Sequence, residues 1–398
     1  MCSLAGTASA QQPPADAGAA NVTAPPEPTP PEVLAPDPGR EVSATPPDDV
    51  GTREPGVEDP PAAAPLAPGA TAPEAVEEPW TLRPPTVTGF IQVHFRTAFR
   101  TGEDPLVDNP NFRVQRARLG VEGELFPWLG YTLGIDPRAP EILGVLRDAY
   151  FTLRFIPRHR IRIGQQKTQF GYENRESSTR LFAVNRTELA DNLARGSNLR
   201  DVGIGLLGNI KLGHGFRIED AVTLVNGNGF NTQLDDTPLK DLWGRIGLRY
   251  KRGSFWARLG FSGGIGDRIE LGDDNLPGTA DDFHLSFRRV GADLEIDQKW
   301  FFLSSEFIYG WDHPGDMEIE SRYGWYLNVV GKTPWDIGPI VRYDMISDDE
   351  FQRFTFGLYY GKADAPFRVM VNYELRLVRE GARVDDKLYL WAQVRFGT

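Results

Sequence analysis

Apolar and polar residues alternate one by one along most of the chain after residue 86. In residues 112–125, for example, Ala117, Leu119, Val121 and Leu125 share one face of an extended strand, and charged residues occupy the other face. Successive side chains of a β-strand point to opposite faces, so this period of two predicts a strand with one apolar and one polar side. A helix would scatter the same charges around its circumference.

The same alternation recurs often enough to predict sixteen strands. An even number is typical of a barrel in the bacterial outer membrane. The strands are expected at 87–100, 112–125, 129–136, 146–155, 159–167, 202–210, 216–226, 241–250, 254–263, 283–296, 300–311, 321–330, 337–345, 351–360, 367–378 and 387–396.

Short and long connections alternate between these strands. Segments 156–158 and 251–253 are short, whereas 168–201 and 264–282 are long. Membrane barrels have short turns in the periplasm and long loops outside, and the strand parity puts both chain ends on the short-turn side. A soluble β-sandwich would alternate too, but with its apolar faces packed inward. The pattern favours an all-β fold, a 16-stranded antiparallel transmembrane β-barrel over residues 86–398.

Tryptophans near the predicted strand ends support a membrane barrel, because tryptophan is enriched at the level of the lipid headgroups. Those near strand ends or turns are Trp80, Trp128, Trp243, Trp300, Trp311, Trp335 and Trp391. A helical membrane bundle is excluded, since the chain has no run of 18 or more apolar residues.

The first 85 residues differ in composition from the rest. Residues 11–85 hold 20 of the 32 prolines and 13 acidic against 3 basic residues. Such a segment buries too little apolar surface to fold, so it is predicted to be a disordered, acidic spacer in the periplasm. A docking segment that contacts the cell wall is the alternative. Residues 1–10 end in Ala8-Ser9-Ala10, which resembles a signal-peptidase site and indicates the remnant of a secretion signal.

The sequence predicts no enzyme, and therefore no catalytic residue, no cofactor and no metal site. The only cysteine is Cys2, and the five histidines stand in no HExxH setting. The glycine-rich segments 227–229 and 263–266 are interpreted as loops or turns, because neither lies between a strand and a helix as a nucleotide-binding loop would. Loop 267–282 could hold calcium loosely or be a solvated acidic loop; its aspartates are Asp273, Asp274, Asp281 and Asp282.

Arginines on the predicted lumenal face are the main candidates for function. Arginine outnumbers lysine 35 to 8, and a guanidinium offers a planar fork of donors that suits phosphate or carboxylate. Basic rings in a pore favour anions. The lumenal positions are Arg96, Arg116, Arg118, Arg154, Arg160, Arg162, Arg245, Arg249 and Arg258. Because Glu122, Glu124, Asp148, Asp293, Glu295 and Glu306 share that face, the wall is either a net basic constriction or a mixed, salt-bridged surface.

The 34-residue connection 168–201 is expected to fold into the barrel and narrow it, since long structureless loops are usually functional. An ordinary extracellular loop is the alternative. Its basic residues are Arg175, Arg180, Arg186, Arg195 and Arg200, and its acidic residues are Glu173, Glu176, Glu188, Asp191 and Asp201. The candidate anion pathway therefore consists of Arg116, Arg118, Arg154, Arg160, Arg162, Arg175, Arg180 and Arg186.

Five segments resemble the phosphate-selective porin O/P family. They are QRARLGVEGELFPWLGYTLGID at 115–136, LRDAYFTLRF at 146–155, RIGQQKTQFGYENRESS at 162–178, LFAVNRT at 181–187 and NLRDVGIGLLG at 198–208.

The resemblance implies a trimeric, 16-stranded, anion-preferring channel, with Arg116 as a constriction arginine and Arg186 near the end of the inward-folded loop. In well-known members a lysine after the motif glutamate helps to bind phosphate. Here Asn174 follows Glu173, and Arg175 comes next. The resemblance therefore implies a general anion preference and leaves phosphate specificity open.

The expected function is passive diffusion of small solutes, mainly anions such as phosphate, across the bacterial outer membrane. The expected partners are outer-membrane lipid, two further copies of the chain and small anions, and no nucleic acid. Two alternatives remain: a plugged structural barrel whose tail contacts the cell wall, and an outer-membrane hydrolase.

Overall fold

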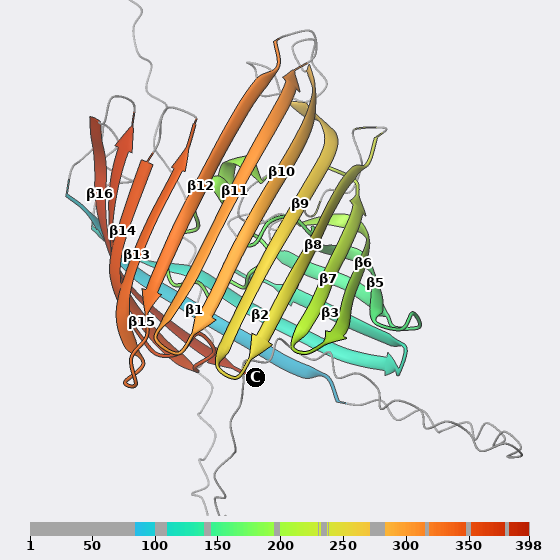
Figure 1. The fold of residues 1–398 in the computed structure, drawn as a ribbon, viewed down its shortest axis with the longest axis horizontal. Coiled ribbons are helices and arrows are strands. Elements are labelled where there is room, and N and C mark those ends of the chain that lie inside the picture. The colour runs from blue at the N-terminus through green and yellow to red at the C-terminus, as the bar shows by residue number, and fades with distance from the viewer. Residues whose placement is uncertain are drawn as a thin grey trace, which may run out of the picture. The chain divides into compact units, whose positions relative to one another are not determined.

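The described part of the chain forms a closed antiparallel β-barrel in the computed structural model (Figure 1). The structure describes residues 84–99, 110–138, 145–194, 200–229, 231, 237, 239–270, 283–314, 318–347, 352–378 and 382–397. Each strand pairs with its neighbours in sequence, and β1 pairs with β16 from Gly89 opposite Phe396 to Ala98 opposite Lys387, which closes the barrel.

The sixteen strands found among the described residues confirm the predicted barrel. Their bounds are β1 Thr86–Ala98, β2 Asn111–Phe126, β3 Leu129–Ile135, β4 Leu146–Leu153, β5 His159–Lys167, β6 Arg200–Gly213, β7 Phe216–Val225, β8 Asp241–Arg252, β9 Phe255–Glu270, β10 Phe283–Gln298, β11 Phe301–Pro314, β12 Glu320–Gly331, β13 Ile337–Ile346, β14 Gln352–Tyr360, β15 Phe367–Val378 and β16 Ala382–Phe396. No helix among them is long and apolar enough to cross a membrane.

The apolar face of each strand points outward, as a membrane barrel requires. In β12, Trp325, Leu327 and Val329 are exposed, whereas the alternate residues Tyr326 and Asn328 are buried inside. This arrangement is the reverse of a soluble sandwich, in which the apolar face forms the core. An outward apolar surface is compatible with a lipid environment and costs free energy in water.

Two β-bulges break the alternation near the start of the barrel. The first bulge is in β2. Gln92 and Val93 of β1 are opposite Arg116 and Val114 of β2, so Gln115 between them has no opposite residue. In β4 a similar shift leaves Arg147 without one, because Gly134 and Ile135 are opposite Asp148 and Leu146. A bulge inserts one extra residue and changes the direction of a side chain. Arg147 is consequently turned inward and is only 7% exposed.

Residues 168–194, which follow β5, lie inside the barrel (Figure 1). Its backbone donates to side chains of the opposite wall: Tyr172 N to Glu306 on β11 at 3.0 Å, and Val184 N to Asn372 on β15 at 2.8 Å. A π-helical turn, η2 (Leu189–Leu193), packs against β11, β12 and β13. This segment, the described residues 168–194, is called the interior loop below.

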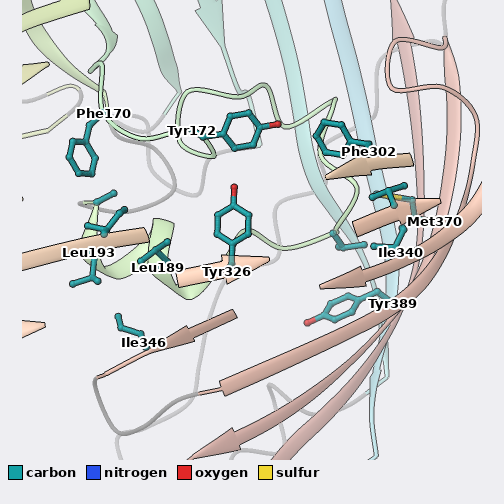
Figure 2. Close-up of a cluster of buried hydrophobic side chains, with 14 of the residues drawn as sticks. Phe170, Tyr172, Leu189, Leu193, Phe302, Tyr326, Ile340, Ile346, Met370 and Tyr389 are labelled. Atoms are coloured by element: carbon teal, nitrogen blue, oxygen red, sulfur yellow. The ribbon is translucent and has the colours of Figure 1, made fainter. Parts of the chain in front are cut away.

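An apolar cluster holds the interior loop against the wall. Figure 2 shows its residues Phe170, Leu189 and Leu193, which face inward side chains such as Tyr326 and Ile346. The three loop residues have no exposed surface. Part of the lumen is therefore filled by packed side chains.

Two tryptophan predictions were wrong. Trp243 and Trp391 do not lie at the lipid headgroups but are buried inside the barrel. Trp243 packs against Phe170 and Phe287, with ring centroids 5.2 and 5.3 Å apart, and Trp391 Nε1 donates to Gln115 at 3.1 Å. Both have the inward parity of their strands. In contrast, Trp128, Trp300 and Trp335 are exposed at short turns, as predicted.

The glycine-rich segment 263–266 is part of strand β9 and not a loop. Its glycines leave room for bulky inward neighbours, since a Cβ at Gly264 would collide with the Trp243 ring. The predicted strand 254–263 thus ends too early.

Several predictions fall outside the described residues. They concern the signal remnant 1–10, nearly all of the spacer 11–85, and Trp80, Arg195, Asp273, Asp274, Asp281 and Asp282.

Candidate functional site

A basic cavity of about 190 Å³ lies between the interior loop and the wall formed by β2 to β6. Six arginines and one lysine line it, against a single aspartate. Its lining residues are Gln115, Arg116, Arg118, Asp136, Arg138, Arg147, Lys167, Ser178, Arg186 and Arg200. A cavity of about 15 Å³ suffices for one water molecule, so this one has room for a small hydrated anion.

Asp136 lies among three of these arginines without forming hydrogen bonds to them. Its carboxylate oxygens are 3.6 Å from Arg118 Nε, 3.9 Å from Arg138 Nε and 3.9 Å from Arg147 Nη2. These are ion-pair distances, longer than those of charged hydrogen bonds. One carboxylate therefore compensates only part of the positive charge in the basic cavity.

Other lining side chains have defined partners. Arg200 makes two parallel hydrogen bonds of 3.0 Å to Asp148 on β4, through Nε and Nη2. Arg116 Nη1 donates to Gln92 at 2.9 Å, and Gln92 in turn donates to the Ser178 carbonyl of the interior loop at 3.1 Å. These bonds fix the guanidinium groups at the cavity surface.

Two cations of the basic cavity bind backbone carbonyls of the interior loop, Lys167 from the end of β5 and Arg186 from within the loop. Lys167 Nζ donates to the carbonyls of Asn174, Arg175 and Glu176 at 3.0, 3.2 and 3.0 Å. Arg186 Nη2 donates to the carbonyl of Glu176 at 2.9 Å, and its Nη1 donates to the carbonyl of Glu173. An ammonium group has three protons, so those of Lys167 are all used by the loop backbone.

A second cavity, of about 290 Å³, shares Arg116 and Arg186 with the basic cavity. It extends toward β14, β15 and β16, and we call it the loop cavity. Its remaining lining residues are Asn185, Glu188, Asp191, Arg353, Arg376, Lys387 and Tyr389. Arg116 and Arg186 therefore stand where the two cavities meet.

The lumenal wall from β8 to β14 is salt-bridged instead. Its pairs include Arg245–Asp293 at 2.5 Å, Arg258–Glu295 at 2.5 Å, Arg289–Asp312 at 2.6 Å and Arg353–Asp344 at 2.9 Å. The two interpretations of the arginine pattern, a basic constriction and a salt-bridged wall, thus apply to different sectors of one barrel.

The predicted site residues separate into two groups. Arg116, Arg118 and Arg186 meet at the basic cavity. The other five do not line this cavity.

Three of those five belong to the wall. Arg154 follows β4 at the short-turn end and donates to Glu124 at 2.6 Å. Arg160 and Arg162 are on β5, and the Arg162 guanidinium stacks 4.7 Å from the centre of the Tyr150 ring.

The other two belong to the interior loop. Arg175 donates to Gln169 at 2.9 Å, and burial, together with the charges of Arg245 and Arg258, lowers its pKa to about 10. Arg180 is 3.6 Å from Glu176 and lines a small separate cavity.

Sequence reasoning did not assign Gln115, Arg138, Arg147 or Lys167 to the site. Arg147 enters through a bulge, which strict alternation does not reveal. Lys167 has the parity of the outward residues Ile161 and Ile163, so the period of two points it toward lipid. Its place in the GQQKT segment was the available signal.

Solved structures of low sequence identity share this fold. An anion-selective porin from Comamonas acidovorans is 13% identical, with a TM-score of 0.58 over 79% of this chain and 99% of that one. The outer membrane protein OmpT of Vibrio cholerae, in its trimer form, is 11% identical, with a TM-score of 0.55 over 79% and 99%. The outer membrane channel DcaP of Acinetobacter baumannii is 15% identical, with a TM-score of 0.54 over 78% and 97%.

No curated protein gives a significant match to the sequence. The sequence profile of the family "Phosphate-selective porin O and P" matches residues 88–213, which run from β1 to the end of β6 and include the interior loop. Residues 88–213 of the chain are thus similar to the phosphate-selective porin O and P family, and its barrel has the porin fold.

Proposed function

We propose that the protein is an outer-membrane porin through which small anions, such as phosphate, diffuse passively. The basic cavity carries this proposal, since six arginines and one lysine line a small polar space, whereas Asp136 is its one acidic lining residue and Asp148 pairs with Arg200. Charged donors in a confined, partly desolvated space favour anions and disfavour cations. Passive diffusion of a solute forms and breaks no covalent bond, so we propose a channel and not an enzyme.

In this proposal the interior loop narrows the route, and solutes pass between it and the wall of β2 to β6. The apolar cluster around Leu189 and Leu193 supports this, because it fills the opposite side of the lumen. Arg116 and Arg186 then lie at the narrowing, where the two cavities meet.

We further propose that the chain forms a homotrimer and that its N-terminal segment lies in the periplasm. The first proposal is supported by the trimer form of the similar OmpT of Vibrio cholerae. The second follows from strand parity, since β1 begins at the end of the barrel that carries the short turns. We also propose that this acidic segment contacts the cell wall.

The test replaces Arg116 and Arg118 together by glutamine. Both face the basic cavity, and neither makes the loop-holding contacts of Arg186. In planar bilayers under a salt gradient, the anion-over-cation permeability ratio is expected to fall roughly tenfold, which corresponds to about 1.4 kcal/mol. This is modest beside the roughly 4 kcal/mol between two charges about 4 Å apart at an effective dielectric constant of about 20.

The matched control is the double variant Arg245→Gln with Asp293→Asn, which removes an ion pair of the salt-bridged wall and leaves the net charge unchanged. Its permeability ratio is expected to equal that of the unmodified protein. An unchanged reversal potential in the Arg116/Arg118 variant would contradict the proposed role of the basic cavity.

A plugged structural barrel is the second candidate, and the packed side chains inside the lumen favour it. Single-channel recording separates the two functions, because a plugged barrel gives no steady conductance.

A further inference from the structure

Two carboxylates of the interior loop, Glu188 and Asp191, line the loop cavity beside Arg116 and Arg186. They differ in their partners. Glu188 Oε1 is 2.7 Å from Arg376 Nη2 and 3.2 Å from Arg353 Nη1, so two guanidinium groups compensate its charge.

Asp191 has no such partner within the described residues. Its Oδ1 is buried and accepts no hydrogen bond there. The backbone N–H of Asp191 donates to the Thr187 carbonyl at 3.1 Å, which fixes the residue in the turn η2. Asp191 is thus held at the cavity by the backbone, while its carboxylate faces the space next to Arg116 and Arg186.

We propose that Asp191 is a specificity-determining residue of the solute route: its ionised carboxylate repels anions that Arg116 and Arg186 attract, and its protonation removes this repulsion. The inference rests on the proposed function, because it concerns the same route. It assigns to one loop residue the adjustment of a selectivity that the arginines establish.

The surroundings of Asp191 favour the neutral acid. Burial, together with the nearby carboxylates Glu173 and Glu188, raises the pKa of Asp191 to about 6, although Arg186 and Arg353 act in the opposite direction. The other charged groups of the loop cavity are Arg116, Arg376 and Lys387. The neighbouring strands carry other charged side chains that point inward, toward the loop. They are Arg289 on β10, Glu306 and Asp312 on β11, Arg322 on β12, and Arg342 and Asp344 on β13.

The direction of the pH effect follows from the raised pKa of Asp191. Above pH 6 the carboxylate is charged, and below pH 6 it becomes neutral, while a free aspartate would stay ionised down to about pH 4. Arginine side chains keep their charge over this range. The loop cavity therefore gains one unit of positive charge as the pH falls from 7.5 to 5.

The experiment uses the purified full-length protein in planar bilayers under a potassium chloride gradient, at pH 7.5 and at pH 5. For the unmodified protein, the chloride-over-potassium permeability ratio is expected to rise roughly threefold at the lower pH. Asp191→Asn is expected to show the higher ratio already at pH 7.5 and to lose most of the pH response. Glu320→Gln, which removes an exposed carboxylate at the start of β12, is the matched control and should behave like the unmodified protein.

Each outcome decides between the two proposals. A channel without anion preference at either pH would contradict the proposed function itself. Two other outcomes would overturn only the role of Asp191. In the first, the channel is anion-selective but its chloride-over-potassium permeability ratio does not change with pH. In the second, the Asp191→Asn variant has the same ratio as the unmodified protein at both pH values. Asp191→Ser, a second neutral variant, is measured alongside, so that a folding failure of one variant does not block the decision.

Discussion

At the scale of the residue, the cations of the interior serve two separate purposes. Arg116 and Arg118 present guanidinium groups to the basic cavity, whereas Lys167 and Arg186 use their protons to bind loop carbonyls. The sequence predicts a cluster of basic residues but not this division. The reason is physical: the partners of Lys167 are backbone carbonyls, which every residue has and no sequence pattern marks.

Replacement of Lys167 by methionine is expected to loosen the interior loop. Three carbonyls lose a charged donor, and since water can reach part of the site, we expect the docked state to lose about 2–4 kcal/mol. Open-channel current should then fluctuate more, and protease should cleave within 172–194 sooner. Lys251→Met is the control, because Lys251 is exposed at the end of β8, next to a short turn. Equal cleavage rates in both variants would refute the loop-holding role.

At the scale of the element, alternation predicted the strands well, and some bounds agree fully, such as 159–167 and 367–378. Each such strand has lipid on one side and polar groups on the other along most of its length, which produces the period of two. The prediction failed where that environment changes. The bulge at Arg147 adds one residue, and near the end of β9 a glycine, Gly264, occupies an inward position against the Trp243 ring.

A disulfide cross-link can test how the interior loop is docked. In a Cys2→Ser background, cysteines at Val184 and Asn372 are expected to form a disulfide on mild oxidation, because the Val184 N–H donates to the Asn372 side chain at 2.8 Å. Electrophoretic mobility without reductant reports the cross-link. The control pairs Val184→Cys with Val371→Cys, whose side chain points outward. Cross-linking of the control but not of the test pair would contradict the observed docking.

At the scale of the whole molecule, the barrel separates three environments: an apolar exterior, a salt-bridged interior sector and a basic sector. The exterior pattern could be predicted from single strands, since each strand alone carries it. The interior sectors could not be, because Arg245 and Asp293 are 48 residues apart and become partners only through strand order.

A charge on the exterior is expected to destabilise the barrel. Val341 is exposed near the middle of β13 and pairs with the outward residues Val329 and Phe356. Val341→Arg is expected to cost about 2–4 kcal/mol of folding free energy in lipid vesicles, measured by urea titration. Val341→Leu should cost less than 1 kcal/mol, which is roughly the limit for an apolar exchange of similar size. An equal loss in both variants would argue against lipid contact at this position.

The hydrogen bonds that hold the interior loop have a consequence for the biogenesis of the barrel. The guanidinium groups that donate hydrogen bonds to its carbonyls include those of Arg342, Arg353 and Arg368, which lie more than 150 residues downstream of their partners. The interior loop and these three arginines cannot make contact until nearly the entire polypeptide has been made. Contacts of such long sequence separation also form late in folding. A chain that has paired only its early hairpins therefore still lacks the constriction, and the finished passage is shaped last.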